Sequence, residues 1–412
     1  MTWAEKTLDE LGHVSRGRSR HRPRDAIHLY GGTHPFFQTG DIKAAQLYLT
    51  DYTQTYSEAG LEQSKKWPAG TLCITIAANI AETAVLGIDG CFPDSVIGFI
   101  PDKNKCDVRF IKYKLEVLKR TFQQVSHGAA QDNLSQEKLL SIRFSVPDHP
   151  EQVRIAEVLS AYDDLMENNR RRMALLEESA RLLYREWFVR LRFPGHEHTG
   201  IQDGVPKGWR KEPLSSLVNV VHGYAFAGEH FVDEPSSRVL MTPGNFRIGG
   251  GIKVDKLKYY SDDGPLELSH VLSPMDLTVT MTDLSKTCDT LGFPAFVPNL
   301  GGLAFLHNQR VGKVVPTGAF FPKFFLYCLL CDPAYRHHVV GAATGTSVKH
   351  TAPTRIVSYS PLLPSRHELI DAFEEYVAPL FQQINCLLAA TQKLQAARDL
   401  LLPRLMSGEV TV

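Results

Sequence analysis

The sequence predicts an α+β protein: two mixed α/β domains in tandem, each followed by one long helix. Three observations predict this fold class: the chain repeats itself, short β-like runs alternate with turn residues, and two long segments have heptad spacing. With 412 residues the chain is long enough for two or three domains. Its net charge of zero counts against a protein that coats nucleic acid along its whole surface, but it allows a local basic groove.

The internal repeat is visible as residue pairs that recur in the same order. Such pairs are Trp3 and Trp209, Leu86-Gly87 and Leu291-Gly292, Gly128 and Gly345, and Glu151 and Glu368. The separation is 206 residues for the first pair and 217 for the last, so we expect one insertion in the second copy.

The first part of each copy mixes strands and a helix. Apolar runs at 72–77, 96–100 and 277–281 are bounded by Gly, Pro, Asn and Asp, which predicts short strands between turns. Residues 111–124 and 323–339 have helix-like patterns late in the two copies.

The second part of each copy is predicted to be one long helix with an apolar seam. The seam residues are Ile155, Leu159, Tyr162, Met166, Asn169, Leu176 and Leu183 in the first helix, and Phe373, Leu380, Leu387, Leu394 and Leu401 in the second. The second set is spaced by seven and matches members of the first set at a constant separation of 218, so we expect each seam to pack against the other as a coiled coil. Asn169 can fix the register of this pair, and Pro379 should kink the second helix or make it restart there.

The predicted boundaries follow from these segments. They are a first mixed domain at 1–147, a long helix at 148–192, a linker at 193–208, a second mixed domain at 209–364, and a second long helix with its tail at 365–412.

No pattern in the chain predicts a catalytic residue. Gly312-Lys313 is followed by Val314, so there is no P-loop for ATP. A metal-dependent nuclease with the motif Pro-Asp…(Asp/Glu)-x-Lys is rejected, because Asp41-Ile42-Lys43 has no Pro-Asp before it. Asp332-Pro333-Ala334-Tyr335 lacks the second proline of an adenine-methyltransferase loop, and we interpret it as a helix break.

No metal site is predicted either. Cys328 and Cys331 precede His337 and His338, but a Cys-x-x-Cys within FFLYCLLC is more simply a buried helix face. Seven scattered cysteines, the absence of a signal peptide and the absence of an apolar run long enough for a membrane span lead us to expect a cytoplasmic protein with free thiols.

The stretch RGRSRHRPR near the N-terminus concentrates positive charge. It places arginines at alternate positions: Arg16, Arg18, Arg20, Arg22 and Arg24. Alternate side chains of an extended segment share one face, and guanidinium groups pair with phosphates or with guanine O6 and N7. The run therefore predicts a DNA-binding loop, with a solvated turn as the alternative.

Polar loops recur at corresponding places in the two copies. The further DNA-binding candidates are Gln38, Thr39, Lys43, Asn79, Gln131 and Asn133 in the first copy, and Asn245, Arg247, Thr346 and Lys349 in the second. Gln and Asn side chains suit adenine edges, although each is also a common turn residue.

Several motifs in this order resemble the specificity subunit of type I restriction-modification systems. They are PFFQTGDI (35–42), GAAQDNLS (128–135), VPDHPEQVRIAEVLSAYDDL (146–165), VPKGW (205–209) and LLPRLMSGEV (401–410). The resemblance covers essentially the whole chain. Departures are GTSVKHTA (345–352), which differs from its partner loop in the first copy, and RHELIDA (366–372), which replaces the usual Glu-Gln-x-x-Ile.

The resemblance implies a function for each part. Each mixed domain would be a target-recognition domain that reads one half of a bipartite, asymmetric DNA sequence. The two helices would form an antiparallel coiled coil, act as a ruler for the unread spacer and dock two methyltransferase subunits. Those partners would bind S-adenosylmethionine, and restriction motor-nuclease subunits would use ATP and Mg, so this chain would need no cofactor and perform no catalysis.

Three other functions stay open from sequence alone. The chain could be a self-contained DNA methyltransferase with degraded motifs, although it lacks a glycine-rich turn for the methyl donor. It could be a coiled-coil scaffold without a DNA role. It could also serve a related modification system that has no motor subunit.

Overall fold

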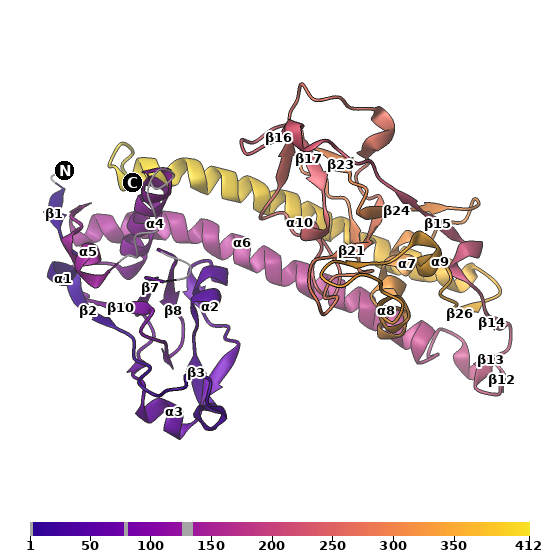
Figure 1. Cartoon of the computed structure of the whole chain (residues 1–412), viewed down its shortest axis with the longest axis horizontal. Helices are drawn as coiled ribbons and strands as arrows, with labels where there is room; N and C mark the ends of the chain where they lie inside the picture. Colours follow the sequence, from indigo (N-terminus) through magenta and orange to yellow (C-terminus); the bar gives the residue numbers. More distant parts are fainter. Residues whose placement is uncertain (1–2, 78–80, 126–134) are drawn as a thin grey trace. The chain divides into compact units, whose positions relative to one another are not determined.

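The computed structural model describes residues 3–77, 81–125 and 135–412 (Figure 1). The chain divides into two compact units: unit 1 is Met1–Asn168 with Lys393–Val412, and unit 2 is Asn169–Gln392. Each unit contains one mixed domain and part of each long helix, α6 (His149–Tyr184) and α10 (Glu368–Met406).

Unit 1 contains two small sheets. The first has the strand order β2-β10-β7-β8-β4, and the second has the order β5-β3-β9-β6. The strands are β2 (Gly12–Arg16), β3 (Tyr30–Phe36), β4 (Tyr48–Leu49), β5 (Gln54–Tyr56), β6 (Lys66–Trp67), β7 (Leu72–Thr75), β8 (Thr83–Leu86), β9 (Gly90–Cys91) and β10 (Val96–Pro101), with the separate pair β1 (Ala4–Lys6) and β11 (Phe144–Val146). The helices are α1 (Leu8–Leu11), α2 (Thr39–Ala44), α3 (Glu58–Glu62), α4 (Val108–Val125) and α5 (Gln136–Ser141).

Unit 2 has the corresponding pair of sheets. Their strand orders are β15-β24-β20-β22 and β16-β18-β17-β23-β19. The strands are β15 (Val218–His222), β16 (Phe231–Val232), β17 (Arg238–Met241), β18 (Lys258–Tyr260), β19 (Val271–Leu272), β20 (Leu277–Thr280), β22 (Pro294–Phe296), β23 (Ala304–His307) and β24 (Val311–Pro316), with the separate pairs β12 (Ile201–Gln202) and β13 (Val205–Pro206), β14 (Trp209–Lys211) and β26 (Leu362–Pro364), and β21 (Thr282–Asp283) and β25 (Lys349–His350). The helices besides α6 and α10 are α7 (Lys323–Leu330), α8 (Pro333–Val340) and α9 (Pro353–Val357).

The two units repeat one topology, which confirms the predicted duplication. The order β2-β10-β7-β8 matches β15-β24-β20-β22, and β5-β3-β9-β6 matches β18-β17-β23-β19. In both units the second sheet contains one parallel pair, β3 with β9 and β17 with β23. The predicted strands and the helix-like segments late in each copy are therefore confirmed, and in the second copy the helical segment is divided between α7 and α8.

The growth in separation between the copies is spread over several connections, so the expectation of one insertion is wrong. Matching strand residues lie 205 apart for Leu72 and Leu277, 211 for Val85 and Phe296, 215 for Val96 and Val311, and 217 for Val146 and Leu363. Each step falls in a loop between strands or after them, where added residues leave the hydrogen-bonded ladders intact.

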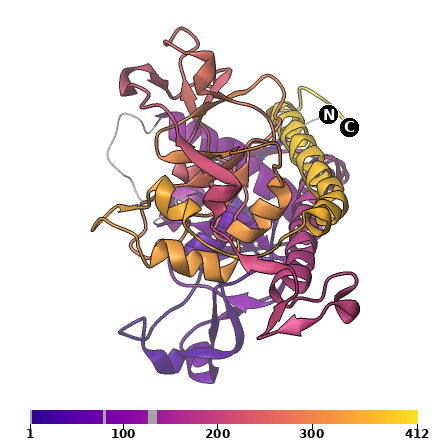
Figure 2. The same cartoon turned by 90° about the vertical axis from the view of Figure 1, so that its right-hand side faces the viewer.

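Helices α6 and α10 pack against each other within each unit, and they run antiparallel. In unit 1, Leu159 of α6 shares a core with Leu402 of α10. In unit 2, Asn169 Nδ2 donates to Thr391 Oγ1 at 3.3 Å, and the rings of Tyr184 and Phe373 are 6.2 Å apart. The partner numbers on α10 fall as those on α6 rise, and the two helices lie side by side in both views (Figure 1, Figure 2). A π-helical turn at Arg185–Val189 continues α6.

Only part of the predicted seam is buried. Buried members are Ile155, Leu159, Met166, Asn169, Phe373 and Leu387, whereas Tyr162, Leu176, Leu183, Leu380, Leu394 and Leu401 are half-buried. Helix α10 continues through Pro379, so the predicted restart does not occur. Pro379 is exposed, while Val377 and Phe381 on either side of it are buried in the core, and their packing holds the helix together there.

Glu374 of α10 should make the stability of unit 2 depend on pH. Its Oε1 accepts a hydrogen bond from Phe325 N at 2.6 Å. Burial raises the pKa of this carboxyl from 4.5 to about 7, although the backbone hydrogen bonds oppose the shift. Because the folded pKa is the higher one, the folded state holds its proton more tightly, and this stabilisation is complete below pH 4.5 and is lost as the pH rises through 7.

We expect Glu374→Gln to remove this loss, because the amide keeps the acceptor oxygen without a charge. The melting temperature of the variant should fall less than that of the parent between about pH 5 and pH 8. Thermal unfolding across this range checks the prediction, and equal slopes for the two proteins would contradict it.

Within the ranges that the structure describes, no helix is long and apolar enough to cross a membrane.

Candidate nucleic-acid interface

The arginine run of unit 1 lies on an exposed segment that follows β2. Arg16 ends the strand, and residues 17–24 continue without regular secondary structure. All five arginines are exposed, while Gly17 and Ser19 between them are buried. A Cβ on Gly17 would lie 2.3 Å from the carbonyl oxygen of Pro93, so only glycine allows the segment to lie this close to the turn before β10.

Three of the five guanidinium groups are bound by the protein itself. Arg16 Nε donates to the Asp94 carbonyl at 3.0 Å, and Arg24 Nη2 pairs with Asp94 Oδ2 at 2.9 Å. Arg22 Nη1 donates to two carbonyl oxygens of its own segment at 2.8 Å. Among the described residues, the side chains of Arg18 and Arg20 have no hydrogen bond or ion pair, which leaves these two best able to reach a phosphate or a base.

A further basic group lies beside these arginines. Lys65 Nζ lies 3.7 Å from the centroid of the Trp67 ring and donates to Ser15 Oγ. Burial lowers the pKa of Lys65, and the charge of Arg18 lowers it further. Because Arg18 lowers the pKa of Lys65 as a nearby like charge, the basic surface extends from the arginine run to the start of β6.

The first polar loop of unit 1 begins α2. Gln38 is the residue before the helix, and its Nε2 donates to Gln54 Oε1 at 2.6 Å. Thr39 is the first helical residue and half-buried, and Lys43 is exposed in the last turn. Asn79, Gln131 and Asn133, the other candidates in this copy, lie outside the described residues.

Two predicted DNA contacts in unit 2 have their polar groups bonded within the unit. Asn245 is 1% exposed: its Oδ1 accepts hydrogen bonds from the backbone and hydroxyl of Thr242, and its Nδ2 donates to the Lys253 carbonyl. Asn245 is a turn residue, and its side chain forms hydrogen bonds with nearby backbone groups. Arg247 pairs with Glu177 Oε2 at 2.6 Å, so its charge is already used within the unit.

The last two candidates of unit 2 lie around β25. Thr346 is exposed, whereas Lys349 is half-buried in the strand and donates from Nζ to the Gly345 carbonyl at 2.8 Å. This loop is tied to β21 through the β21–β25 pair.

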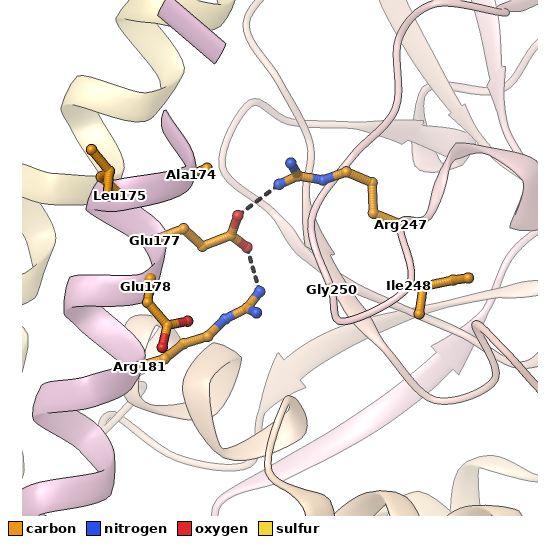
Figure 3. Close-up of a pocket in the computed structure, with 8 residues that line it drawn as sticks. All are labelled: Ala174, Leu175, Glu177, Glu178, Arg181, Arg247, Ile248 and Gly250. Atoms are coloured by element: carbon orange, nitrogen blue, oxygen red, sulfur yellow. Dashed lines mark hydrogen bonds and ion pairs between the residues drawn. The ribbon is translucent and has the colours of Figure 1, made fainter. Parts of the chain in front are cut away.

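Glu177 gathers a charged cluster that sequence reasoning missed (Figure 3). The residue is 7% exposed, and its carboxylate pairs with Arg181 at 2.5 Å and with Arg247, while Tyr327 OH also donates to it. Glu177, Arg181 and Arg247 line an open pocket together with Leu175 and Ile248. Burial and then the charge of Glu177 raise the pKa of Tyr327 well above its ordinary value. The cluster is held within the unit and connects α6 to the mixed domain.

The sequence around Asp332 is a helix break, as predicted: α7 ends at Leu330 and α8 begins at Pro333. Asp332 Oδ1 accepts from Ala334 N at 2.8 Å and caps α8, and Tyr335 is buried. Cys328 is buried on α7. In the described part of the chain, no three His, Cys, Asp or Glu side chains are grouped so that they could hold a metal ion.

Comparisons with known proteins give this architecture a family. Residues 1–178 match the type I restriction modification DNA specificity domain. The chain is 23% identical over 430 residues to the type I restriction enzyme MjaIX specificity subunit of Methanocaldococcus jannaschii, a match that covers 100% of this chain and 94% of the relative. It is 21% identical over 323 residues to the HindI specificity subunit of Haemophilus influenzae, covering 66% of this chain and 70% of that protein.

A solved structure supports the fold. The S subunit of a type I restriction-modification system from M. genitalium is similar with a TM-score of 0.56 and 14% identity, over 98% of this chain and 96% of that one. Residues 1–178 therefore match a DNA specificity domain, and the solved structure shares the fold. Over its whole length the chain is similar to a specificity subunit of a type I restriction-modification system, in agreement with the resemblance of its motifs.

Proposed function

We propose that this chain reads a bipartite, asymmetric DNA target, with one mixed domain for each half. The observation that carries the proposal is that the two units share one strand order but expose different side chains. A shared framework presents its loops in the same way, and base readout depends on the side chains placed on them. Two unlike surfaces on like frameworks suit two different half-sites.

Unit 1 supports the proposal through its basic run. Arg18 and Arg20 are exposed on a segment anchored by Gly17. Guanidinium groups bind phosphates in a bidentate manner and also pair with guanine O6 and N7. This surface therefore suits both the positioning of a duplex and the reading of its bases.

The chemistry of modification would come from partner subunits. We expect two methyltransferase subunits, which bind S-adenosylmethionine, and restriction motor-nuclease subunits, which use ATP and Mg. The long helices would dock the methyltransferase subunits and act as the ruler for the unread spacer. This chain itself would bind none of these cofactors and perform no catalytic step.

Co-expression with the methyltransferase subunit tests the proposal. Methylated adenines mapped by long-read sequencing of the host genome should fall in a two-part motif with a fixed gap. Methylation by this chain alone would favour a self-contained methyltransferase. A soluble complex that leaves genomic adenines unmethylated would favour a scaffold without a DNA role.

The double substitution Arg18→Ala/Arg20→Ala should weaken DNA binding about ten-fold or more at moderate salt, because up to two phosphate contacts are lost. The slope of log K against log salt should become shallower by up to about 2, since each phosphate contributes about 0.9. Binding of a target duplex at several salt concentrations measures both effects.

The matched control is Arg22→Ala/Arg24→Ala, which removes the same charge from the same segment. Its effect should be smaller, because the guanidinium groups of Arg22 and Arg24 are bound by Ser19, His21 and Asp94. Equal losses from the two double variants would mean that the run acts only through its total charge.

A further inference from the structure

We propose that Tyr224, Gln309 and Arg310 form the DNA-reading surface of unit 2, the counterpart of the arginine run in unit 1. The inference rests on the proposed function and names the residues that would determine the second half-site. Neither Tyr224, Gln309 nor Arg310 was a candidate from sequence, because the two segments have almost no identity.

The backbone equivalence of the two segments is close. Strand β2 pairs antiparallel with β10, with Arg16 opposite Ile97, and β15 pairs in the same way with β24, with His222 opposite Gly312. Two residues beyond those strand ends, Arg18 N donates to the Phe92 carbonyl at 3.2 Å and Tyr224 N donates to the His307 carbonyl at 2.7 Å. Residues 16–24 and 222–230 therefore leave equivalent strands in the same way.

A glycine makes the same close approach in both units. A Cβ on Gly17 would lie 2.3 Å from the Pro93 carbonyl oxygen, and a Cβ on Gly223 would lie 2.2 Å from the His307 carbonyl oxygen. Real Cβ atoms do not come this close to a backbone oxygen. Glycine is thus required at each position to lay the following residues against the turn that leads into β10 or β24.

The turn beneath each segment is also the same. In unit 1, Val96 N donates to the Pro93 carbonyl, and in unit 2, Val311 N donates to the Asn308 carbonyl, both at 3.0 Å. These matching hydrogen bonds make Asn308 the counterpart of Pro93, so Gln309 occupies the position that Asp94 has in unit 1. The turn touches the segment directly, because Gln309 N donates to the Tyr224 carbonyl at 3.0 Å.

The charges are exchanged between segment and turn. In unit 1 the segment carries the arginines, and Asp94 of the turn pairs with Arg24. In unit 2 the segment carries aromatic residues, and the turn carries Gln309 and Arg310, both exposed. Among the described residues neither of these two side chains has a hydrogen bond or an ion pair. A positive charge and an amide are thus presented at the same place on an equivalent framework.

Tyr224 is held in place while 49% of it remains exposed. Its ring stacks on His270 with centroids 4.3 Å apart and an angle of 17°. Phe226, which is buried, contacts the Tyr224 ring edge-on at 5.2 Å and anchors the segment. An exposed aromatic ring fixed from behind is arranged for a contact that loses little side-chain entropy.

The chemistry of this surface points to a half-site read through adenine and thymine. A glutamine amide pairs with adenine N6 and N7 in a bidentate manner, and an aromatic ring makes apolar contact with the thymine methyl group. Arg310 can bind the adjacent phosphate. Glu229, near the end of the segment, is exposed and repels phosphates, so the contact is confined to Tyr224 and the turn.

The experiment is methylome mapping with the complete complex, using Gln309→Ala and Tyr224→Ala separately. We expect each variant to relax one position of the half-site that Arg18→Ala/Arg20→Ala leaves unchanged, with about a ten-fold loss of discrimination between bases there. Gln202→Ala, which removes an exposed glutamine of β12 in the same unit, serves as the control and should leave both halves intact. Co-purification with the methyltransferase subunit and the melting temperature check that each variant is folded.

Two results would overturn the inference. If the wild-type complex gives a two-part motif and both Gln309→Ala and Tyr224→Ala leave it unchanged, unit 2 reads DNA elsewhere. If either variant relaxes the half-site that the arginine substitutions also change, the assignment of this surface to the second half is wrong. If the wild-type complex gives no two-part motif, the proposed function itself is wrong, and this inference is overturned with it.

Discussion

Replacing Arg398 by alanine should lower the free energy of unfolding of unit 1 by about 3–5 kcal/mol, the usual cost of breaking a buried ion pair from one side. Arg398 lies on α10 and is 4% exposed. Its Nη1 and Nη2 donate to the two carboxylate oxygens of Glu116 at 2.6 and 2.7 Å. Its Nε lies 3.4 Å from Asp163 Oδ1, an ion-pair contact rather than a hydrogen bond.

The large effect comes from the groups that would be left behind. Asp163 is 3% exposed and would keep only the hydrogen bond from Tyr113 OH, at 2.6 Å. Burial raises the pKa of Glu116, but Lys112 and Arg398 outweigh it and hold the pKa at about 2, so this carboxylate is charged in the folded protein. Without Arg398, the buried Asp163 would lose the guanidinium beside it, and Glu116, whose side chain is 21% exposed, would keep Lys112, which pairs with it at 2.8 Å.

Hydrogen exchange in increasing urea, analysed separately for peptides of each unit, measures this effect. Arg404→Ala is the control, because Arg404 lies on the same helix but pairs with Glu409 in an exposed ion pair of about 0–1 kcal/mol. Losses of similar size in the two variants would mean that the buried network contributes no more than a surface pair.

These networks explain where sequence reasoning about the long helices succeeded and where it failed. Heptad spacing is a local property, so the helices and much of their seam could be predicted. The pattern selected Tyr162 and Leu176, which are half-buried, whereas the neighbouring Asp163 and Glu177 are buried. A buried carboxylate is tolerable only with its partners, and those partners, Arg398 among them, are far away in sequence.

The candidate site divides in the same way. The exposure of Arg16, Arg18 and Arg20 around the buried Gly17 and Ser19 could be predicted from the sequence, because an extended chain has a period of two. The burial of Asn245 could not, since its role is a turn that closes with Thr242 and Lys253. Tyr224 was missed because its match to unit 1 consists of backbone hydrogen bonds and one glycine rather than of similar side chains.

Glu177→Ala should destabilise unit 2 by about 2–3 kcal/mol, between the cost of an unsatisfied buried donor and that of an unpaired buried charge. The effect should be smaller than that of Arg398→Ala, because the two cations that it strands are partly exposed: the side chain of Arg181 is 20% exposed and that of Arg247 is 41%. Water can therefore replace part of what the carboxylate supplies, although Tyr327 OH, which is buried, would lose its acceptor.

The next residue on α6 provides the control. Glu178 is exposed, so Glu178→Ala removes the same charge one residue away and should change stability by less than about 0.5 kcal/mol. Hydrogen exchange of unit 2 peptides in urea compares the two variants, and equal effects would mean that the Glu177 cluster is only a surface feature. A loss of stability in Glu177→Ala alone would instead mean that the ion pair between Glu177 and Arg247 stabilises unit 2. Recognition of the second half-site would then depend on residues whose side chains are not bound within the unit.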